Sequence, residues 1–328
     1  MSGLTKAPAA AEKASNAPGG KAVVSSVGAV IVTYRPDIAK LARVIESIVP
    51  QVDRVIVVDN GSPQTLTLQI NELCVKHEAS LLEQSSNVGI AAAQNRGIEA
   101  LLAQQYDYVL LLDHDSVPAD EMVGELVRAD TALRSQGHSV GAVGPVCEDF
   151  RTGSQWPFIR LEHGVVRRVA CSQACPLVRT DFLIASGSLI HHSVFRVVGL
   201  MNEAFFIDHV DTEWCLRASA AGLSMFGVCA ARLDHELGDR IVRLWFFRWR
   251  EVPVHTPVRM YYMFRNTIRM LAGTPMRWSW RVAHTFRLVQ FVFFYSVLVA
   301  PRKTYSKAMF LGVLDAVQQR MYAIRRSL

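Results

Sequence analysis

Short apolar runs rich in β-branched residues alternate with longer stretches of helical periodicity from Val27 onward, and this alternation constrains the fold most. Runs buried on both faces are typical of parallel strands, and the stretches between them are long enough for crossover helices. The pattern predicts an α/β fold: a mostly parallel, Rossmann-like central sheet with helices on both faces. The expected strands are residues 27–32, 54–59, 80–82 and 108–112, and the expected helices are 38–49, 65–77, 90–104 and 211–221.

Two later segments are less regular. Residues 148–180 are polar and show no clear periodicity, so we expect an irregular segment that passes over the ligand-binding site described below. Residues 182–190 (FLIASGSLI) are expected to form a strand, with Gly187 where another group approaches closely.

The triplet Asp113-His114-Asp115 directly follows the apolar run YVLLL. Open parallel sheets bind ligands at the carboxyl ends of their strands. A diphosphate leaving group needs a hard cation held by carboxylates, and two Asp side chains one residue apart can supply them. Asp-x-Asp triplets also occur on solvated turns, so the position after a strand is what predicts a metal and nucleotide site here.

Asp59 closes the second expected strand at the same edge of the sheet. Its carboxylate can accept a hydrogen bond from a ring N–H of a pyrimidine base. Thr33 and Tyr34, just after the first strand, are expected to line the same nucleoside pocket. The alternative for Asp59 is a turn residue before Asn-Gly, and both interpretations can hold together.

Residues 87–97 (NVGIAAAQNRG) open a helix with small side chains. We expect Asn87 to cap this helix and a diphosphate to approach its start, with Asn87, Gly89 and Asn95 as binding candidates. Small helical residues also mean tight packing with a neighbouring element. The spacing does not match a dinucleotide fingerprint, which argues against a nicotinamide cofactor.

Three carboxylates, Asp208, Asp211 and Glu213, lie within six residues at a helix start between aromatic flanks. Solvated helix starts also collect acids, but apolar surroundings would partly desolvate a carboxylate and suit it to general base catalysis. Asp211 is the first candidate for this base and Asp208 the second. His235, in the run DHELG, is either a surface histidine or a third metal ligand, and the sequence alone favours the surface histidine.

The composition adds expectations about location and partners. Residues 1–26 are rich in Ala, Ser, Gly, Pro and Lys and contain no apolar run of the kind a secretory signal needs, so we expect a disordered tail on a cytosolic protein. The six cysteines include one close pair, Cys171 and Cys175, with no second pair to complete a zinc site, and free buried thiols are expected. The net charge of +6 is concentrated in the last ninety positions, which suggests an anionic surface as partner. No nucleic-acid partner is expected.

The carboxyl-terminal residues 272–328 are basic and apolar and predict a helical region. Their most apolar stretch, residues 288–300 (LVQFVFFYSVLVA), is shorter than the roughly twenty residues that a membrane span requires. Arg, Lys and Trp frame this stretch, as in helices that lie at a membrane interface beside anionic lipids. A core helix packed on the catalytic domain is the alternative, and the sequence leaves both open.

Seven motifs occur in a fixed order, and together they resemble family-2 glycosyltransferases of the GT-A fold. The motifs are VGAVIVTYRPD, VVDNGS, NVGIAAAQNRG, LLLDHDS, SGSLI, VGLMNEAFFIDHVDTEWCLRA and DHELG. The resemblance covers about residues 27–271, the expected catalytic domain. FIDHVDTEW and residues 261–266 (YYMFRN) are most similar to bacterial rhamnosyltransferases that use dTDP-L-rhamnose.

This resemblance implies roles for the candidate residues. Asp59 would contact the base, Asp113 the nucleotide and Asp115 a divalent metal, Mg²⁺ or Mn²⁺, with Asp113 and His235 assisting; Asp211 would be the catalytic base. The implied reaction inverts the anomeric centre and transfers L-rhamnose to a hydroxyl of a lipid-linked glycan or glycolipid, in O-antigen, polysaccharide or rhamnolipid synthesis. The implied location is peripheral, on the cytoplasmic face of the inner membrane. The alternatives are transfer of another sugar from a UDP-sugar and a non-catalytic nucleotide-sugar-binding module.

Overall fold

The computed structural model describes residues 25–149, 154–162, 164–172, 176–235, 240–246 and 248–324. The expected tail therefore lies outside the described residues except for Ser25 and Ser26. Ser26 donates hydrogen bonds from its backbone N–H and its hydroxyl to Asp107 Oδ2, at 2.8 and 3.0 Å. The chain is thus fixed to the domain from Ser26 onward.

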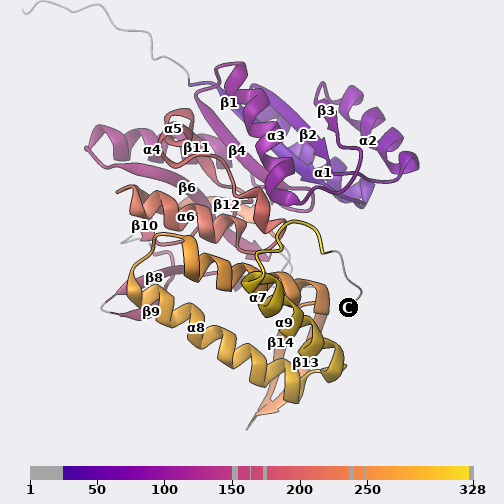
Figure 1. Cartoon of the computed structure of the whole chain (residues 1–328). Helices are drawn as coiled ribbons and strands as arrows, with labels where there is room; N and C mark the ends of the chain where they lie inside the picture. The colour runs from indigo at the N-terminus through magenta and orange to yellow at the C-terminus, as the bar shows by residue number, and fades with distance from the viewer. Residues whose placement is uncertain are drawn as a thin grey trace, which may run out of the picture.

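One mixed sheet dominates the structure, with the strand order β10-β12-β6-β11-β4-β1-β2-β3 (Figure 1). Strands β3, β2, β1 and β4 are parallel to one another, β11 is antiparallel to both of its neighbours, and β6 and β12 are parallel to each other. β5 and β7 pair with β12 and β6 at the margin. The bounds are β1 Val27–Thr33, β2 Arg54–Asp59, β3 Ser80–Glu83, β4 Tyr108–Asp113, β5 Val117–Pro118, β6 Val140–Asp149, β7 Ser154–Gln155, β10 Leu177–Thr180, β11 Leu189–His191 and β12 Ser224–Asp234.

Helices cover both faces of the sheet, as the alternation predicted. Their bounds are α1 Ile38–Ile48, α2 Gln64–Lys76, α3 Ile90–Ala103, α4 Met122–Ser135, α5 His192–Val198, α6 Val210–Ala220, α7 Pro257–Gly273, α8 Trp278–Phe293 and α9 Arg302–Val317. Short 3₁₀ helices occupy Val49–Gln51 and Glu203–Phe205, and a π-helical segment, Phe294–Leu298, follows α8.

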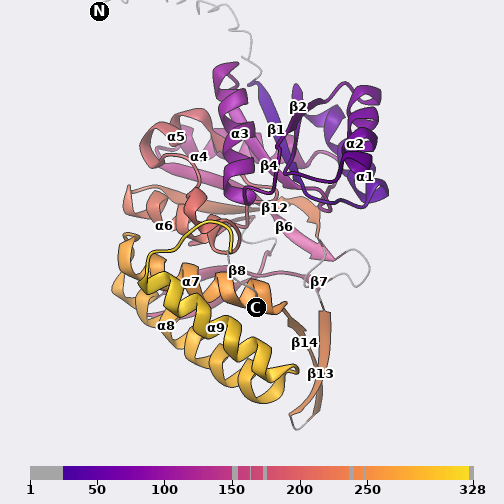
Figure 2. The same ribbon diagram turned by 45° about the vertical axis from the view of Figure 1, so that its right-hand side comes forward.

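Alternate residues of β1 enter two separate hydrophobic cores, because successive side chains of a strand point to opposite faces. Val30 and Val32 pack with residues of α3, α5 and α6, whereas Ala29 and Ile31 pack with residues of α1, α2 and α4. Figure 2 shows α3 on one side of β1 and β2 and the α1–α2 pair on the other. Burial on both faces explains why these strands are continuous apolar runs.

Two of the expectations for the middle of the chain are wrong. Residues 148–180 are not simply irregular, because they include the end of β6, β7, β10 and a hairpin formed by β8 Phe158–Glu162 and β9 Val165–Val169. Residues 182–190 form no continuous strand: β11, at the end of this range, pairs with β4 and β6, and Phe182 forms an isolated bridge with Ile159. The positive φ of Gly187 (85°) turns the chain there, and a Cβ at this position would lie 2.5 Å from Pro145 Cγ. The predicted close approach at Gly187 is therefore correct.

The expectation of free thiols is wrong for two cysteines. Cys171 and Cys229 form a disulfide across 58 positions of sequence. Pairing of β10 with β12 brings the segment before β10 alongside β12, where the Cys229 N–H donates to Pro176 O. Cys74, Cys147 and Cys215 are free and buried, and Cys175 lies outside the described residues.

Helices α7, α8 and α9 gather beyond α6 on one side of the sheet, next to the hairpin of β13 Arg240–Phe246 and β14 Arg248–Val254 (Figures 1 and 2). Their shared core includes Met260, Phe264, Tyr295 and Met309. Residues 288–300 are only partly buried. Tyr295 and Val299 lie in this core, whereas much of the remainder is exposed. Within the described ranges, no helix combines the length and apolar character needed to cross a membrane.

Candidate active site

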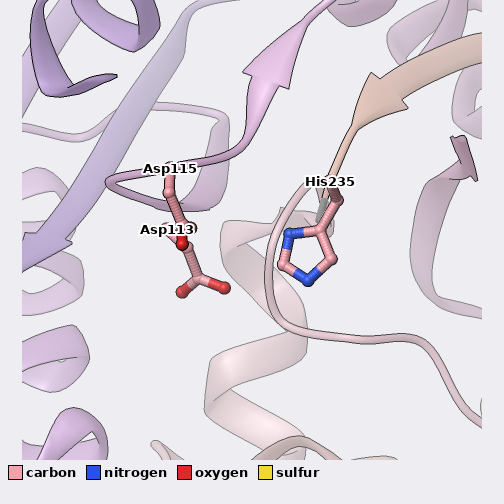
Figure 3. A group of neighbouring side chains, drawn as sticks. All are labelled: Asp113, Asp115 and His235. Atoms are coloured by element: carbon pink, nitrogen blue, oxygen red, sulfur yellow. The ribbon is translucent and has the colours of Figure 1, made fainter. Parts of the chain in front are cut away.

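Asp113, Asp115 and His235 converge at the carboxyl edge of the sheet (Figure 3). Asp113 is the last residue of β4, Asp115 follows in the adjacent turn, and His235 follows β12. One ligand atom from each side chain lies within 4.8 Å of the other two. Two carboxylates and an imidazole are suitable ligands for Mn²⁺ or Mg²⁺, so the donor set fits a divalent cation.

Neighbouring groups fix the orientation of His235. Its Nδ1 lies 2.6 Å from the hydroxyl of Ser116, a fully buried residue in the turn after Asp115. The Trp156 ring meets the imidazole edge to face at a centroid distance of 5.4 Å. Such outer contacts set the tautomer and direction of a ligating imidazole. They hold His235, which comes from a distant part of the sequence, against the Asp-x-Asp turn.

The electrostatics of the site favour a cation. Burial raises the pKa of Asp113 to about 6, and the negative charges of Asp115 and Asp211 add to this shift, while His114 and Arg259 oppose it. The backbone N–H of Asp113 donates to Ser186 Oγ at 3.0 Å. Carboxylates crowded in a partly buried site are stabilised when a bound metal ion neutralises their charge.

The predicted nucleoside residues line the same edge. In the sheet register, Thr33 is paired with Asp59, and Val32 is paired with Asp113. Thr33 is fully buried, and its hydroxyl has no hydrogen-bond partner among the described residues. Tyr34 is 38% exposed, at the surface beside this edge.

The Asp59 carboxylate organises its own turn. It accepts hydrogen bonds from the Ser62 N–H at 3.1 Å, the Ser62 hydroxyl at 2.6 Å and the Thr67 hydroxyl at 3.1 Å. Asp59 is 1% exposed. The interpretation of Asp59 as a turn residue is therefore correct, and its contact with a base stays a prediction.

Asn87 does not cap α3, contrary to expectation. Gly89 occupies the N-cap position, and no side chain caps this helix. Asn87 Oδ1 instead accepts from the Gly89 N–H at 3.0 Å and from Asn60 Nδ2 at 3.2 Å. Helix α3 begins at Ile90, three residues after Asn87, and Gly89 has a φ of 93°, so Asn87 links the turn at Asn60 to the Gly89 backbone.

Asn95 lies one turn inside α3, and its side chain is used within the protein. Its amide donates to Met201 O and to Glu203 Oε1, both at 2.9 Å, and its Oδ1 accepts from the Met201 N–H. The residue is 3% exposed. In the structure Asn95 anchors the loop that leads to α6, and its predicted contact with the nucleotide stays a prediction.

Asp211 is in the first turn of α6, close enough to Asp113 for its charge to raise the Asp113 pKa. Burial raises the pKa of Asp211 itself, while hydrogen bonds from the Thr212 N–H and hydroxyl oppose the shift. A pocket of about 150 Å³ adjoins it, and Trp156, Phe158 and Phe182 contribute aromatic walls. Asp211 thus offers a partly desolvated carboxylate beside an apolar cavity.

Asp208 is bound differently from Asp211. Its Oδ1 lies 2.7 Å from Arg259 Nη2 and 3.2 Å from Nε, which forms an ion pair. Its Oδ2 is buried and has no hydrogen-bond partner among the described residues. The ion pair makes Asp208 the weaker candidate for a base that accepts a proton.

Two residues of α7 that the sequence did not assign to the site hold the loop before Asp211. Asn266 Nδ2 lies 2.8–2.9 Å from the carbonyl oxygens of Phe205, Ile207 and Asp208. The Arg265 guanidinium donates to the carbonyls of Ala204 and Phe205 and to Tyr322 O. Both side chains are 0% exposed. The sequence signal was the motif YYMFRN at residues 261–266, which was noted for its family resemblance but given no structural role.

Comparison with known proteins identifies a family domain within the chain. Residues 29–176 match the family described as Glycosyl transferase family 2. These residues form a family 2 glycosyl transferase domain. The match covers β1 to β4, both aspartates of the Asp-x-Asp turn and the β6–β9 region.

A curated relative extends the likeness beyond this domain. The chain is 29% identical over 300 residues to the dTDP-rhamnosyl transferase RfbF of Shigella flexneri, covering 90% of this chain and 96% of that protein. These two matches identify the protein as a glycosyltransferase.

Solved structures agree on the GT-A fold. A crystal structure of GalNAc-T7 with UDP, GalNAc and Mn²⁺ superposes with a TM-score of 0.60 at 12% identity, over 92% of this chain and 57% of that one. The chain therefore spans little more than half of that larger protein. The mannosyltransferase PcManGT of Pyrobaculum calidifontis, in complex with GDP-Man and Mn²⁺, gives a TM-score of 0.52 at 12% identity, over 90% and 87% of the two chains.

Proposed function

We propose that this glycosyltransferase moves L-rhamnose from dTDP-L-rhamnose to a hydroxyl of a lipid-linked glycan or glycolipid, with inversion at the anomeric carbon. The likeness to the Shigella flexneri dTDP-rhamnosyl transferase along nearly all of both chains supports the donor. The observation that carries the chemistry is the convergence of Asp113, Asp115 and His235 with Asp211 at one edge of the sheet. A lipid-linked acceptor would be presented at a membrane, which we propose is the cytoplasmic face of the inner membrane.

The donor is proposed to lie across the carboxyl edge of β1, β2 and β4. Asp59 and Thr33 would face the base, with Tyr34 beside them, and Asp113 the ribose and diphosphate. The unpartnered, buried Thr33 hydroxyl supports this, because a ligand group would satisfy it. Gly89 and Asn87 flank the same edge and are proposed to let the diphosphate approach closely.

Asp115, Asp113 and His235 are proposed to hold the divalent cation. A cation at this position would neutralise charge on the departing diphosphate. The fold itself brings these ligand atoms within 4.8 Å of one another, since Asp113 ends β4, His235 follows β12 and Ser116 contacts the imidazole. This arrangement supports Mg²⁺ and Mn²⁺ equally.

Asp211 is proposed to act as the general base. The acceptor oxygen forms a bond to the anomeric carbon, the bond from that carbon to the diphosphate oxygen breaks, dTDP leaves, and the acceptor proton passes to Asp211. A carboxylate whose pKa is raised by burial is a stronger base than an exposed one, which supports this role. The adjoining apolar pocket would exclude water that competes with the acceptor.

The test is Asp211→Asn, which keeps the shape of the side chain and removes its basicity. We expect dTDP to bind within about threefold of wild type while turnover falls by about 10²–10⁴, the usual contribution of a general base. Asp120→Asn, at an exposed position, is the matched control and should turn over normally. An Asp211→Asn enzyme with wild-type turnover would rule out the proposed base.

A further inference from the structure

Helix α8 carries an apolar stripe on its solvent side. Trp278, Val282, Phe286, Val289 and Phe293 recur every three or four residues and therefore share one face of the helix. Exposure ranges from 54% for Val282 to 75% for Trp278. We call these five residues the α8 stripe. A run of large exposed apolar side chains along one helix face is typical of an interaction site.

The opposite side of α8 packs against the rest of the protein. Trp280 and His284 are buried, and the Trp280 ring meets Phe182 edge to face at 4.6 Å. Leu288 and Phe291 pack against the core shared with α7 and α9. Only the outward face lacks a partner among the described residues.

Helix α9 extends the apolar surface. Its Phe310, Val313 and Val317 are exposed and lie on one face. The Ser306 hydroxyl, on α9, donates to Ser296 Oγ at 3.0 Å, in the segment after α8. Both ribbon views show α8 and α9 side by side on the side of the molecule away from β1–β4 (Figures 1 and 2).

The charge around this surface has one sign. Residues 272–324 contain seven basic residues and a single acid, Asp315. Asp315 is 3% exposed and accepts a hydrogen bond from the Tyr261 hydroxyl at 2.9 Å, so it adds little negative charge to the surface. This stretch therefore accounts for the whole net charge of +6. The basic residues are Arg277, Arg281, Arg287, Arg302, Lys303, Lys307 and Arg320.

We propose that the α8 stripe and the exposed face of α9 dock on an anionic phospholipid bilayer, with both helices lying in the interface. Apolar side chains would enter the headgroup boundary while the basic residues contact lipid phosphates. Self-association through the same face would bring two positive rims together, which opposes a dimer. At 16 residues, or about 24 Å, α8 is too short to span the bilayer.

Docking on a bilayer would place the enzyme beside a lipid-linked acceptor, and this part of the inference rests on the proposed function. The docking itself does not depend on that function. Vesicle binding requires no donor or acceptor and can be measured separately. Loss of dTDP binding with intact vesicle binding would overturn the proposed function alone, and the reverse result would overturn the docking alone.

The experiment is co-sedimentation of the purified full chain with phosphatidylglycerol-containing vesicles and with pure phosphatidylcholine vesicles. We expect at least about tenfold tighter binding to the anionic vesicles, because each basic residue near the surface contributes to attraction. The double variant Phe286→Ser/Phe293→Ser should lose at least about tenfold in binding to anionic vesicles. Lys303→Glu/Lys307→Glu should lose most of the preference for anionic lipid.

Two α2 residues provide the matched control. Leu68 and Val75 are exposed apolar residues on α2, 58% and 71% exposed, and Leu68→Ser/Val75→Ser should bind vesicles like wild type. All variants should keep wild-type dTDP binding and melting temperature within a few degrees. Equal vesicle binding by wild type and Phe286→Ser/Phe293→Ser would overturn the proposal. So would absence of vesicle binding together with a dimer, detected by light scattering, that this double variant dissociates.

Discussion

Asn266 offers the sharpest test of how the structure positions Asp211. Its Nδ2 serves three backbone carbonyls, those of Phe205, Ile207 and Asp208, and its Oδ1 accepts from Arg265 Nε at 3.0 Å. An amide has two N–H groups, so the three carbonyls share them. Asn266→Ala removes all of these contacts at once.

The expected cost follows from burial. A buried polar group without a hydrogen-bond partner costs about 1–3 kcal/mol. Asn266→Ala removes the partner of the Arg265 Nε–H and of at least two carbonyl groups, and water would replace some of these hydrogen bonds. We expect a loss of about 3–4 kcal/mol in the free energy of unfolding, which lowers the melting temperature by on the order of 10 °C. A loop displacement of about 1 Å ahead of Asp211 would cost about 10²-fold in kcat.

The assay combines thermal melting with steady-state kinetics. We expect the loss to appear in kcat, with the donor KM changed less than about threefold, because Asn266 holds the base loop and not the nucleotide edge. Val258→Ala, at an exposed position of the same helix, is the control and should behave like wild type. A melting temperature within about 2 °C of wild type, or an unchanged kcat, would refute the reasoning.

Two further substitutions probe the site. Burial raises the folded-state pKa of Asp113 from its ordinary value of 3.8 to about 6. The metal-free protein is therefore most stable at low pH with respect to this group, and it loses that stability as the pH rises through about 6. In EDTA at pH 8, Asp113→Asn should therefore exceed wild type by up to about 3 kcal/mol in the free energy of unfolding and should melt at a higher temperature. This difference should vanish near pH 4. Melting temperatures equal to those of wild type at both pH values would contradict the prediction. Gly89→Ala should destabilise more than Gly137→Ala, because both glycines have positive φ but only a Cβ at Gly89 meets Phe206, at 2.7 Å. Melting curves that rank the two variants oppositely would exclude this clash.

The amino-terminal half of the sheet could be predicted because its signal is local. Strands β1, β2 and β4 are buried on both faces, so each reads as an uninterrupted apolar run, and the polar residue that ends it marks the edge of the sheet. Asp59 and Asp113 were found in this way. His235 was not, since only the family resemblance indicated that β12 returns to the Asp-x-Asp turn.

The remaining errors share a cause: contacts distant in sequence decide the outcome. The Cys171–Cys229 pairing depends on β10 joining β12. The sequence likewise could not show that Asn95 makes hydrogen bonds to Met201 and Glu203, more than one hundred positions away. The roles of Arg265 and Asn266 could not be predicted, because the sequence does not show that α7 packs against the loop before α6.

Titration calorimetry tests the central claim most directly. Purified protein is titrated with dTDP and, separately, with UDP, in the presence of Mg²⁺ or Mn²⁺ and again in EDTA, for wild type and Asp115→Ala. The account predicts tighter binding of dTDP than UDP, dependence on the metal, and loss of the metal-dependent part in Asp115→Ala. Tighter binding of UDP would contradict the rhamnosyl donor, and metal-dependent binding that survives in Asp115→Ala would contradict the metal site.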